Sequence, residues 1–350
     1  MSVHESVVIG GGQAGLSASY HLKRRGIDHV LLDANRRPGG AWQHRWDSLT
    51  MTDVHGVAAL PDSTPPSAPG ERANVAVARY FADYEREHDL PVIRPVRVDR
   101  VTSRGDLLVV RAGERTWTAS TIVNATGTWD RPFVPHYPGI ETFGGEQLHT
   151  TDYPGAEHFR GRRVLVVGGG ASAVQFLGEL APVTDTVWVT RRPPVWRSGE
   201  FDREAGHEAV ALVEERVRRG LPPASVVSVT GLALRDQERL AESLGAYRRR
   251  PMFASIEPGG VRWPDGSVER VDVILWATGF RPAVSHLAPL RLRGPLGGIQ
   301  LDGTTAVADP RVQLVGYGPS ASTIGANRAG RAAAIAVSRR GSRPRDRAAT

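Results

Sequence analysis

Two glycine-rich turns constrain the fold of this 350-residue chain more than any other feature. Each turn follows a short apolar run, precedes a helical pattern and leads to a second apolar run. The turns read Gly10-x-Gly12-x-x-Gly15 and Gly168-x-Gly170-x-x-Ala173. The second apolar run ends 23 positions after the first glycine in both units, at Asp33 in one and at Arg191 in the other. Strand, glycine turn, helix and strand form the βαβ unit that binds dinucleotides, so the chain contains two such units.

A second pair of similar segments, 122–127 and 274–279, follows the two units at a comparable spacing. This internal similarity predicts an α/β fold with two Rossmann-like dinucleotide-binding domains. After Gly279 the chain continues with an expected strand at 312–315 and a helix at 325–338, which the first domain needs as closing elements. We therefore expect the second domain to be inserted in the first. The expected limits are 1–145 and 280–338 for the first domain, 146–279 for the second, and 339–350 for a basic, disordered tail.

The first unit has the residues of an FAD site. Gly10 permits a tight turn, Gly12 lets the backbone approach a pyrophosphate, and Gly15 lets helix and strand pack closely. The helix N-terminus offers unpaired N–H groups to that pyrophosphate, and Asp33 can accept hydrogen bonds from a ribose diol. The alternative is a purely structural turn. The predicted FAD contacts in this unit are Gly10, Gly12, Gln13, Ala14, Gly15, Asp33 and Ala34.

The second unit has basic residues where the first has an acid. Arg191 occupies the position that matches Asp33, and Arg192 follows it. A planar guanidinium group pairs with a ribose 2′-phosphate, which predicts NADPH rather than NADH, although NADH stays possible. Ordinary surface charge in an arginine-rich chain is the alternative. The predicted NADP contacts are Gly168, Gly170, Ser172, Ala173, Arg191, Arg192, Thr278 and Gly279.

Between the two units lies Phe143-x-Gly145-x-x-x-His149-x-x-x-Tyr153, a pattern that composition alone would rarely produce. With this segment the chain resembles the flavin-containing monooxygenases and the related Baeyer–Villiger enzymes, and its length resembles the short bacterial members. The resemblance covers almost the whole chain. It also includes both glycine turns, Gly39-Gly40-Ala41-Trp42, Ala125-Thr126-Gly127 and Ala277-Thr278-Gly279-Phe280-Arg281-Pro282.

The resemblance implies roles for further residues. It places His149 at the domain junction, where it positions the nicotinamide cofactor; a buried histidine bonded to a backbone carbonyl is the alternative. It implies that the loop with Gly40, Trp42 and Trp46 wraps the flavin, although the tryptophans are also compatible with plain core positions. It further implies FAD contacts for Val98, through its backbone beside the adenine, and for Thr126, Gly127, Gly316 and Ile324.

The segment Thr52-Asp53-Val54-His55 departs from many relatives, which carry asparagine or serine-proline beside the flavin. Asp53 and His55 are therefore candidate acid–base residues, and an exposed loop is the alternative. The chain carries no aspartate or glutamate in the expected last strand and the segment after it (312–320) that would bind the flavin ribityl chain. Backbone N–H groups near Ile324, at a helix start, are the expected substitutes.

The implied function is an FAD-dependent, NAD(P)H-using monooxygenase. Such an enzyme forms a C4a-(hydro)peroxyflavin with O₂ and oxygenates a small soft nucleophile (a sulfide or an amine) or a ketone. Two alternatives stay open: an NAD(P)H oxidase or flavin-dependent reductase that passes electrons to O₂, a quinone or a protein, and a non-enzymatic redox or nucleotide sensor.

Composition narrows the possibilities further. The chain has no cysteine, which excludes dithiol and iron–sulfur chemistry, and we expect no metal site. The net charge is +7, but the arginines are spread along the sequence, so we expect no nucleic-acid partner. Without a signal peptide pattern or a long apolar run, the expectation is a cytoplasmic monomer or homodimer that acts on a small molecule away from membranes.

Overall fold

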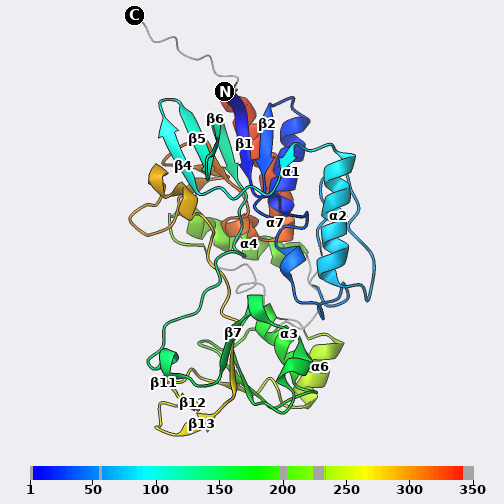
Figure 1. The fold of residues 1–350 in the computed structure, drawn as a ribbon, viewed down its shortest axis with the longest axis vertical. Coiled ribbons are helices and arrows are strands. Elements are labelled where there is room, and N and C mark those ends of the chain that lie inside the picture. Colours follow the sequence, from blue (N-terminus) through cyan, green and yellow to red (C-terminus); the bar gives the residue numbers. More distant parts are fainter. Residues whose placement is uncertain (1–2, 55–56, 197–202, 224–231, 233, 342–350) are drawn as a thin grey trace, which may run out of the picture.

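The computed structural model describes residues 3–54, 57–196, 203–223, 232 and 234–341. Two layers, each built around a sheet, lie one above the other along the long axis in Figure 1. The upper layer contains the N-terminal strands and the C-terminal helix, and the lower layer contains the middle of the chain. Among the described residues we find no helix with the length and apolar content of a membrane span.

The first sheet has the strand order β15-β16-β17-β6-β1-β2-β3, and β4 and β5 extend from β6 as an antiparallel meander. The central strand β1 runs parallel to both β2 and β6, as the first βαβ unit requires. Its strands are β1 (Val3–Ile9), β2 (His29–Leu32), β3 (Val92–Ile93), β4 (Arg100–Arg104), β5 (Leu107–Ala112), β6 (Arg115–Asn124), β15 (Leu301–Asp302), β16 (Thr305–Ala306) and β17 (Val312–Leu314).

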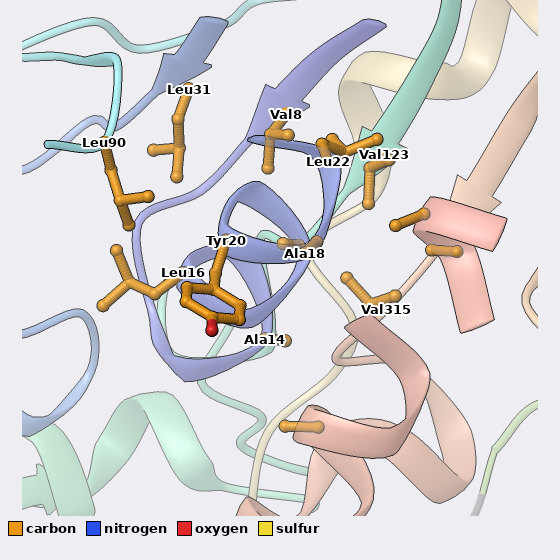
Figure 2. Close-up of a cluster of buried hydrophobic side chains, with 14 of the residues drawn as sticks. Val8, Ala14, Leu16, Ala18, Tyr20, Leu22, Leu31, Leu90, Val123 and Val315 are labelled. Carbon is orange, nitrogen blue, oxygen red and sulfur yellow. The ribbon is translucent and has the colours of Figure 1, made fainter. Parts of the chain in front are cut away.

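Three helices pack on this sheet: α1 (Gln13–Lys23), α2 (Ala73–Glu87) and α7 (Thr323–Gly341). Figure 2 shows Leu16, Ala18 and Leu22 of α1 among apolar side chains from the strands. Helix α1 is buried because α7 covers it, and a Cβ at Gly330 would lie 2.5 Å from the Ser17 hydroxyl oxygen. The close packing of α1 and α7 therefore depends on small residues. The sequence analysis did not identify α2.

The second sheet is entirely parallel, in the order β10-β9-β8-β14-β7. Helix α3 packs against its core together with α6, and a small antiparallel sheet of β11, β12 and β13 lies beside it. These elements are β7 (Glu146–His149), β8 (Val164–Val167), α3 (Ala171–Leu180), β9 (Thr186–Val189), α6 (Asp236–Ser243), β10 (Arg249–Arg250), β11 (Ser255–Glu257), β12 (Gly260–Arg262), β13 (Val268–Arg270) and β14 (Val273–Trp276).

Short 3₁₀ turns complete the described structure. They are η1 (Trp42–His44), η2 (Ile140–Thr142), η3 (Thr150–Asp152), η4 (Ala156–Phe159), η5 (Ser285–Leu290) and η6 (Gly318–Ala321).

The strands of the second sheet all lie between β6 and β15 in the chain, so the second domain is inserted in the first, as predicted. The chain leaves and re-enters the first domain through two adjacent segments. Phe133 N donates to Gly279 O at 3.0 Å, and Ala283 N donates to Gly127 O at 2.9 Å. The two connecting segments are therefore bonded to each other.

Helix α4 (Arg203–Arg218) packs on the first domain, although it lies between strands of the second domain in the chain. Its Val217 is buried in the core of the first domain with Leu292 and Tyr317. The amide of Gln300 donates to the carbonyl of Arg218 at 2.9 Å. A segment within the inserted part of the chain therefore packs on the first domain. The residue limits of the two domains stay predictions.

Candidate functional site

A cleft with a volume of about 560 Å³ lies in the first domain, at the carboxyl ends of β1, β2 and β6. This is where ligands bind in open α/β sheets. Twelve of the predicted FAD contacts line it: Gly10, Gly12, Gln13, Ala14, Asp33, Ala34, Gly40, Trp42, Val98, Thr126, Gly127 and Gly316. Segments far apart in the sequence thus meet around one cavity.

Two glycines of the first glycine turn have no room for a side chain, whereas the third, Gly12, is open toward the cleft. A Cβ at Gly10 would lie 2.5 Å from Ala125 O, and a Cβ at Gly15 would lie 1.9 Å from Gly10 O. At Gly12, by contrast, the nearest atom is the Gly40 Cα at 3.9 Å. Gly12 is also the N-cap of α1 and provides no capping side chain, so the helix N-terminus is open to the cleft. This cradle fits a dinucleotide pyrophosphate.

Asp33 directly follows β2 at the edge of the cleft and is buried. One carboxylate oxygen accepts from the Asn35 side chain at 3.1 Å, and the other accepts from Arg94 Nη2 at 3.1 Å. Arg94 also pairs with Glu85 of α2 at 2.6 Å. The acid is therefore held in place from two sides, and it fits the predicted hydrogen bond to a ribose. Sequence reasoning did not identify Arg94 and Glu85.

A loop covers the glycine turn. A Cβ at Gly40 would lie 2.7 Å from Gly12 Cα, and Gly40 has φ +51°, so only glycine suits this position. Beyond it, the Arg45 guanidinium carbon lies 5.6 Å from the Trp42 ring centre and 4.7 Å from the Trp129 ring centre. Trp129 also stacks on Phe280 at 5.0 Å. The cleft therefore has an aromatic wall.

A buried polar pair, which sequence reasoning missed, contributes to the cleft. His286 of η5 lines the cavity, and its Nε2 lies 2.6 Å from the Asn124 side-chain oxygen. Burial lowers the pKa of His286 to about 4, so the imidazole is neutral near pH 7. These two residues are 162 positions apart, and no local pattern indicates that they meet.

Val98 does line the cleft, but it lies in the segment between β3 and β4 rather than in a strand. Ile324 is the second residue of α7, and its side chain lies outside the described residues. The nearby Ser322 and Ala326 line the cleft.

Trp46, a predicted FAD contact, packs in the core of the second domain and is not among the residues that line the cleft. Its ring lies 4.8 Å from that of Phe176, and its Nε1 donates to Glu179 at 2.9 Å. Glu179 also accepts from Ser48 and Tyr153. The plain-core alternative therefore holds for Trp46, because its loop crosses to the inserted domain.

Asp53 has a structural role that differs from the predicted acid–base role. Its carboxylate accepts from the Thr50 hydroxyl at 2.5 Å and from the Thr50 N–H at 3.3 Å. Its backbone carbonyl accepts from Gln175 of α3 at 2.9 Å and from Arg235. The carboxylate closes a turn, and the residue is not part of the cleft lining. His55 lies outside the described residues.

His149 lies at the domain junction, at the end of β7. Its Nε2 lies 3.0 Å from Gly279 O, and its ring contacts Phe280 edge-on with ring centres 5.0 Å apart. Burial lowers the pKa of His149, so the neutral ring donates to that carbonyl. Through Phe280, which stacks on Trp129, the histidine connects to the aromatic wall of the cleft.

The second glycine turn repeats the geometry of the first. A Cβ at Gly168 would lie 2.2 Å from Ala277 O, just as Gly10 approaches Ala125, while Gly170 has no atom within 4 Å of its Cβ position. Ala173 is fully buried and Ser172 is partly buried. The open helix start of α3 therefore fits a second pyrophosphate.

Arg191 and Arg192 follow the end of β9 and are exposed. Arg249 of β10, which sequence reasoning missed, lies next to them, because its Nε donates to Thr190 Oγ1 at 2.7 Å. Thr278 and Gly279 bond to the connecting segment instead: the Thr278 hydroxyl and the Gly279 carbonyl both pair with the backbone of Phe133. In the described part of the chain, no three histidine or acidic side chains form a metal-binding group.

The fold and the two glycine turns define a two-domain, dinucleotide-binding oxidoreductase. The profile of the pyridine nucleotide-disulphide oxidoreductase family matches residues 7–221. A flavin-containing monooxygenase from Stenotrophomonas maltophilia has 38% identical residues and a TM-score of 0.85, and the match covers 97% of this chain and 100% of that one. The chain belongs to the flavin-containing monooxygenase family, within the pyridine nucleotide-disulphide oxidoreductases.

Two further relatives agree with this membership. A Baeyer–Villiger monooxygenase of Streptomyces coelicolor is 32% identical over 347 residues, which cover 90% of this chain and 65% of the relative. The uncharacterised oxidoreductase CzcO of Bacillus velezensis is 25% identical over 301 residues, which cover 80% of this chain and 82% of the relative.

Proposed function

We propose that this protein is an FAD-dependent monooxygenase that uses NADPH. The main support is the cleft itself, where the open Gly12 position, the helix start and the buried Asp33 converge. These groups would hold the pyrophosphate and the adenosine ribose of FAD. When bound, FAD would supply hydride acceptance and oxygen activation, and the protein would supply binding, orientation and exclusion of water.

The surroundings of the cleft suit a cofactor-driven reaction. Its buried histidine, His286, is neutral and bonded to Asn124, and Asp53 is bonded within its own turn. Neither side chain is free to exchange protons with a substrate. The aromatic wall of Trp42, Trp129 and Phe280 provides apolar area against which a planar ring can pack. His149 would act through Phe280 as a positioning residue at the domain junction.

The second glycine turn would bind the nicotinamide nucleotide. Arg191 and Arg192 are exposed where the adenosine ribose of that nucleotide would lie, and Arg249 adds a third guanidinium group next to them. Three cationic groups favour a 2′-phosphate, so NADPH is the proposed donor.

The proposed substrates are small sulfides, amines or ketones, in keeping with the flavin-containing and Baeyer–Villiger monooxygenases among the relatives. The test is a panel of these three classes under ¹⁸O₂, with product mass and H₂O₂ both measured. One ¹⁸O atom in the product supports oxygenation. Stoichiometric H₂O₂ with every substrate would instead favour the oxidase alternative, and no NADPH consumption at all would favour the sensor.

A further inference from the structure

Arg45 is a buried cation in the cleft for which the described part of the chain offers no counter-ion. Among the described residues it forms no ion pair, and its Nε is buried without a hydrogen-bond partner. Two other arginines near the cleft are paired: Arg94 with Asp33 and Glu85, and Arg97 with Asp130. The acids that line the same cleft, Asp33, Asp99 and Asp130, are each paired with another arginine.

Two aromatic rings lie next to the Arg45 guanidinium group. Its guanidinium carbon lies 5.6 Å from the Trp42 ring centre and 4.7 Å from the Trp129 ring centre. Its backbone carbonyl accepts from the Asn74 side chain at 3.0 Å, which fixes the main chain. Burial lowers the pKa of Arg45 to about 10, so the group stays charged near pH 7. Cation–π contacts offset only part of the cost of removing a charge from water.

The position of Arg45 indicates which anion would pair with it. The residue lines the same cleft as the glycine turn, and its loop contacts that turn where Gly40 approaches Gly12. The N-terminus of α1 opens into this cleft and carries partial positive charge. A fixed cation and a helix start in one cavity match a group with two adjacent phosphates.

We propose that the Arg45 guanidinium binds the pyrophosphate of the dinucleotide that occupies this cleft. FAD is the expected source, because the α1 N-terminus belongs to the same cavity, and to that extent the inference rests on the proposed FAD site. NADP(H) carries the same chemical group and is the other source to be tested.

The first test compares Arg45→Met, Arg45→Lys and the control Arg86→Met. Arg86 lies on α2, is exposed and pairs with Asp83. Fluorescence of released FAD should show that Arg45→Met weakens FAD binding about 10- to 100-fold, the effect of losing a charged hydrogen bond. Arg45→Lys should retain part of the affinity, and the control should match the wild type. Unchanged FAD binding and unchanged NADP⁺ binding in Arg45→Met would overturn the proposal.

The second test measures thermal unfolding without nucleotide. Removing an unpaired buried cation should leave the Tm of the stripped Arg45→Met protein equal to or above that of the wild type. The variant would then be stable but would bind nucleotide weakly. If Arg45→Met instead has a lower Tm than the wild type, FAD binding by Arg45→Lys is the deciding measurement. Recovered FAD binding in Arg45→Lys supports the proposal, and no recovery overturns it.

The two nucleotide sources are separated by titrating the same variants with NADP⁺. A loss confined to FAD supports the flavin nucleotide as the ligand of Arg45. A loss confined to NADP⁺ supports the pyrophosphate chemistry and assigns it to the nicotinamide nucleotide. A wild-type protein that binds neither nucleotide would contradict the proposed function itself, and this outcome is distinct from a specific failure of Arg45.

Discussion

The indole Nε1 of Trp46 donates a 2.9 Å hydrogen bond to the carboxylate of Glu179, from a loop of the first domain to a helix of the second. The same carboxylate accepts from Ser48 at 2.6 Å and from Tyr153 at 3.0 Å. Three donors from two separate segments thus converge on one acid of α3. This cluster connects the loop that covers the cleft to the domain that carries the second glycine turn.

Replacing Trp46 should weaken this connection. Trp46→Phe removes the indole donor from a buried carboxylate, so we expect the free energy of unfolding to fall by about 1–3 kcal/mol. Trp117→Phe is the matched control, since Trp117 is partly exposed on β6 and contacts Arg115 instead. Urea unfolding monitored by circular dichroism measures both. Equal losses in the two variants would contradict a specific role for the Trp46 hydrogen bond.

Glu179 should make stability depend on pH. Burial raises the pKa of Glu179 above its ordinary value, although the three donors oppose this shift. The folded state therefore retains the proton more strongly than the unfolded state, and this contribution to stability is lost as the pH rises through the folded pKa. The difference in unfolding free energy between wild type and Glu179→Gln should fall as the pH increases from 4 to 7. A difference that is constant over this range would show that the pKa is not raised.

Alanine substitutions at Gly168 and at Gly170 should have different effects on stability and on nucleotide binding. A Cβ at Gly168 would lie 2.2 Å from the Ala277 carbonyl oxygen, at φ +144°, so Gly168→Ala should destabilise the fold by more than about 2 kcal/mol. Gly170→Ala meets no atom within 4 Å and should melt like the wild type. Because the added methyl group lies where the pyrophosphate would approach, Gly170→Ala should nevertheless raise the KM for NADPH. Wild-type kinetics in Gly170→Ala would argue against a nucleotide at this turn.

Arg191→Ala should raise the KM for NADPH about tenfold or more, through loss of a charged hydrogen bond to the 2′-phosphate. The KM for NADH should change little, because NADH lacks that phosphate. Arg160→Ala is a suitable control, since Arg160 is exposed and pairs with Glu157. Steady-state kinetics with both nucleotides measures the effect, and an equal rise for NADPH and NADH would refute 2′-phosphate recognition.

His149→Ala should raise the KM for NADPH while the FAD content of the protein stays unchanged, because His149 is bonded at the junction and does not itself line the cleft. Burial lowers the pKa of His149, so its ring is already neutral at pH 7 and should add no pH dependence to KM between pH 7 and 8.5. His158→Ala, at an exposed histidine beside Glu146, is the control. Loss of FAD from His149→Ala would instead indicate a general structural role.

The amino-acid sequence by itself determined the features that depend on local geometry. A glycine turn between a strand and a helix needs only neighbouring residues, and both turns adopt the expected contacts, Gly10 with Ala125 and Gly168 with Ala277. The insertion of one domain in the other also followed from the order of similar segments along the chain.

Only the tertiary structure decided which side chains reach the cleft. Trp42 lines the cleft and Trp46 enters the other domain, although four positions separate them in one loop. Asp53 bonds within its own turn, while α4 packs on the first domain from within the inserted segment. Whether Arg45 has an ion-pair partner depends on the positions of the nearby acidic side chains, which are paired with other arginines. The contact of Trp46 with Glu179 joins residues 133 positions apart, and no local sequence pattern specifies such a contact.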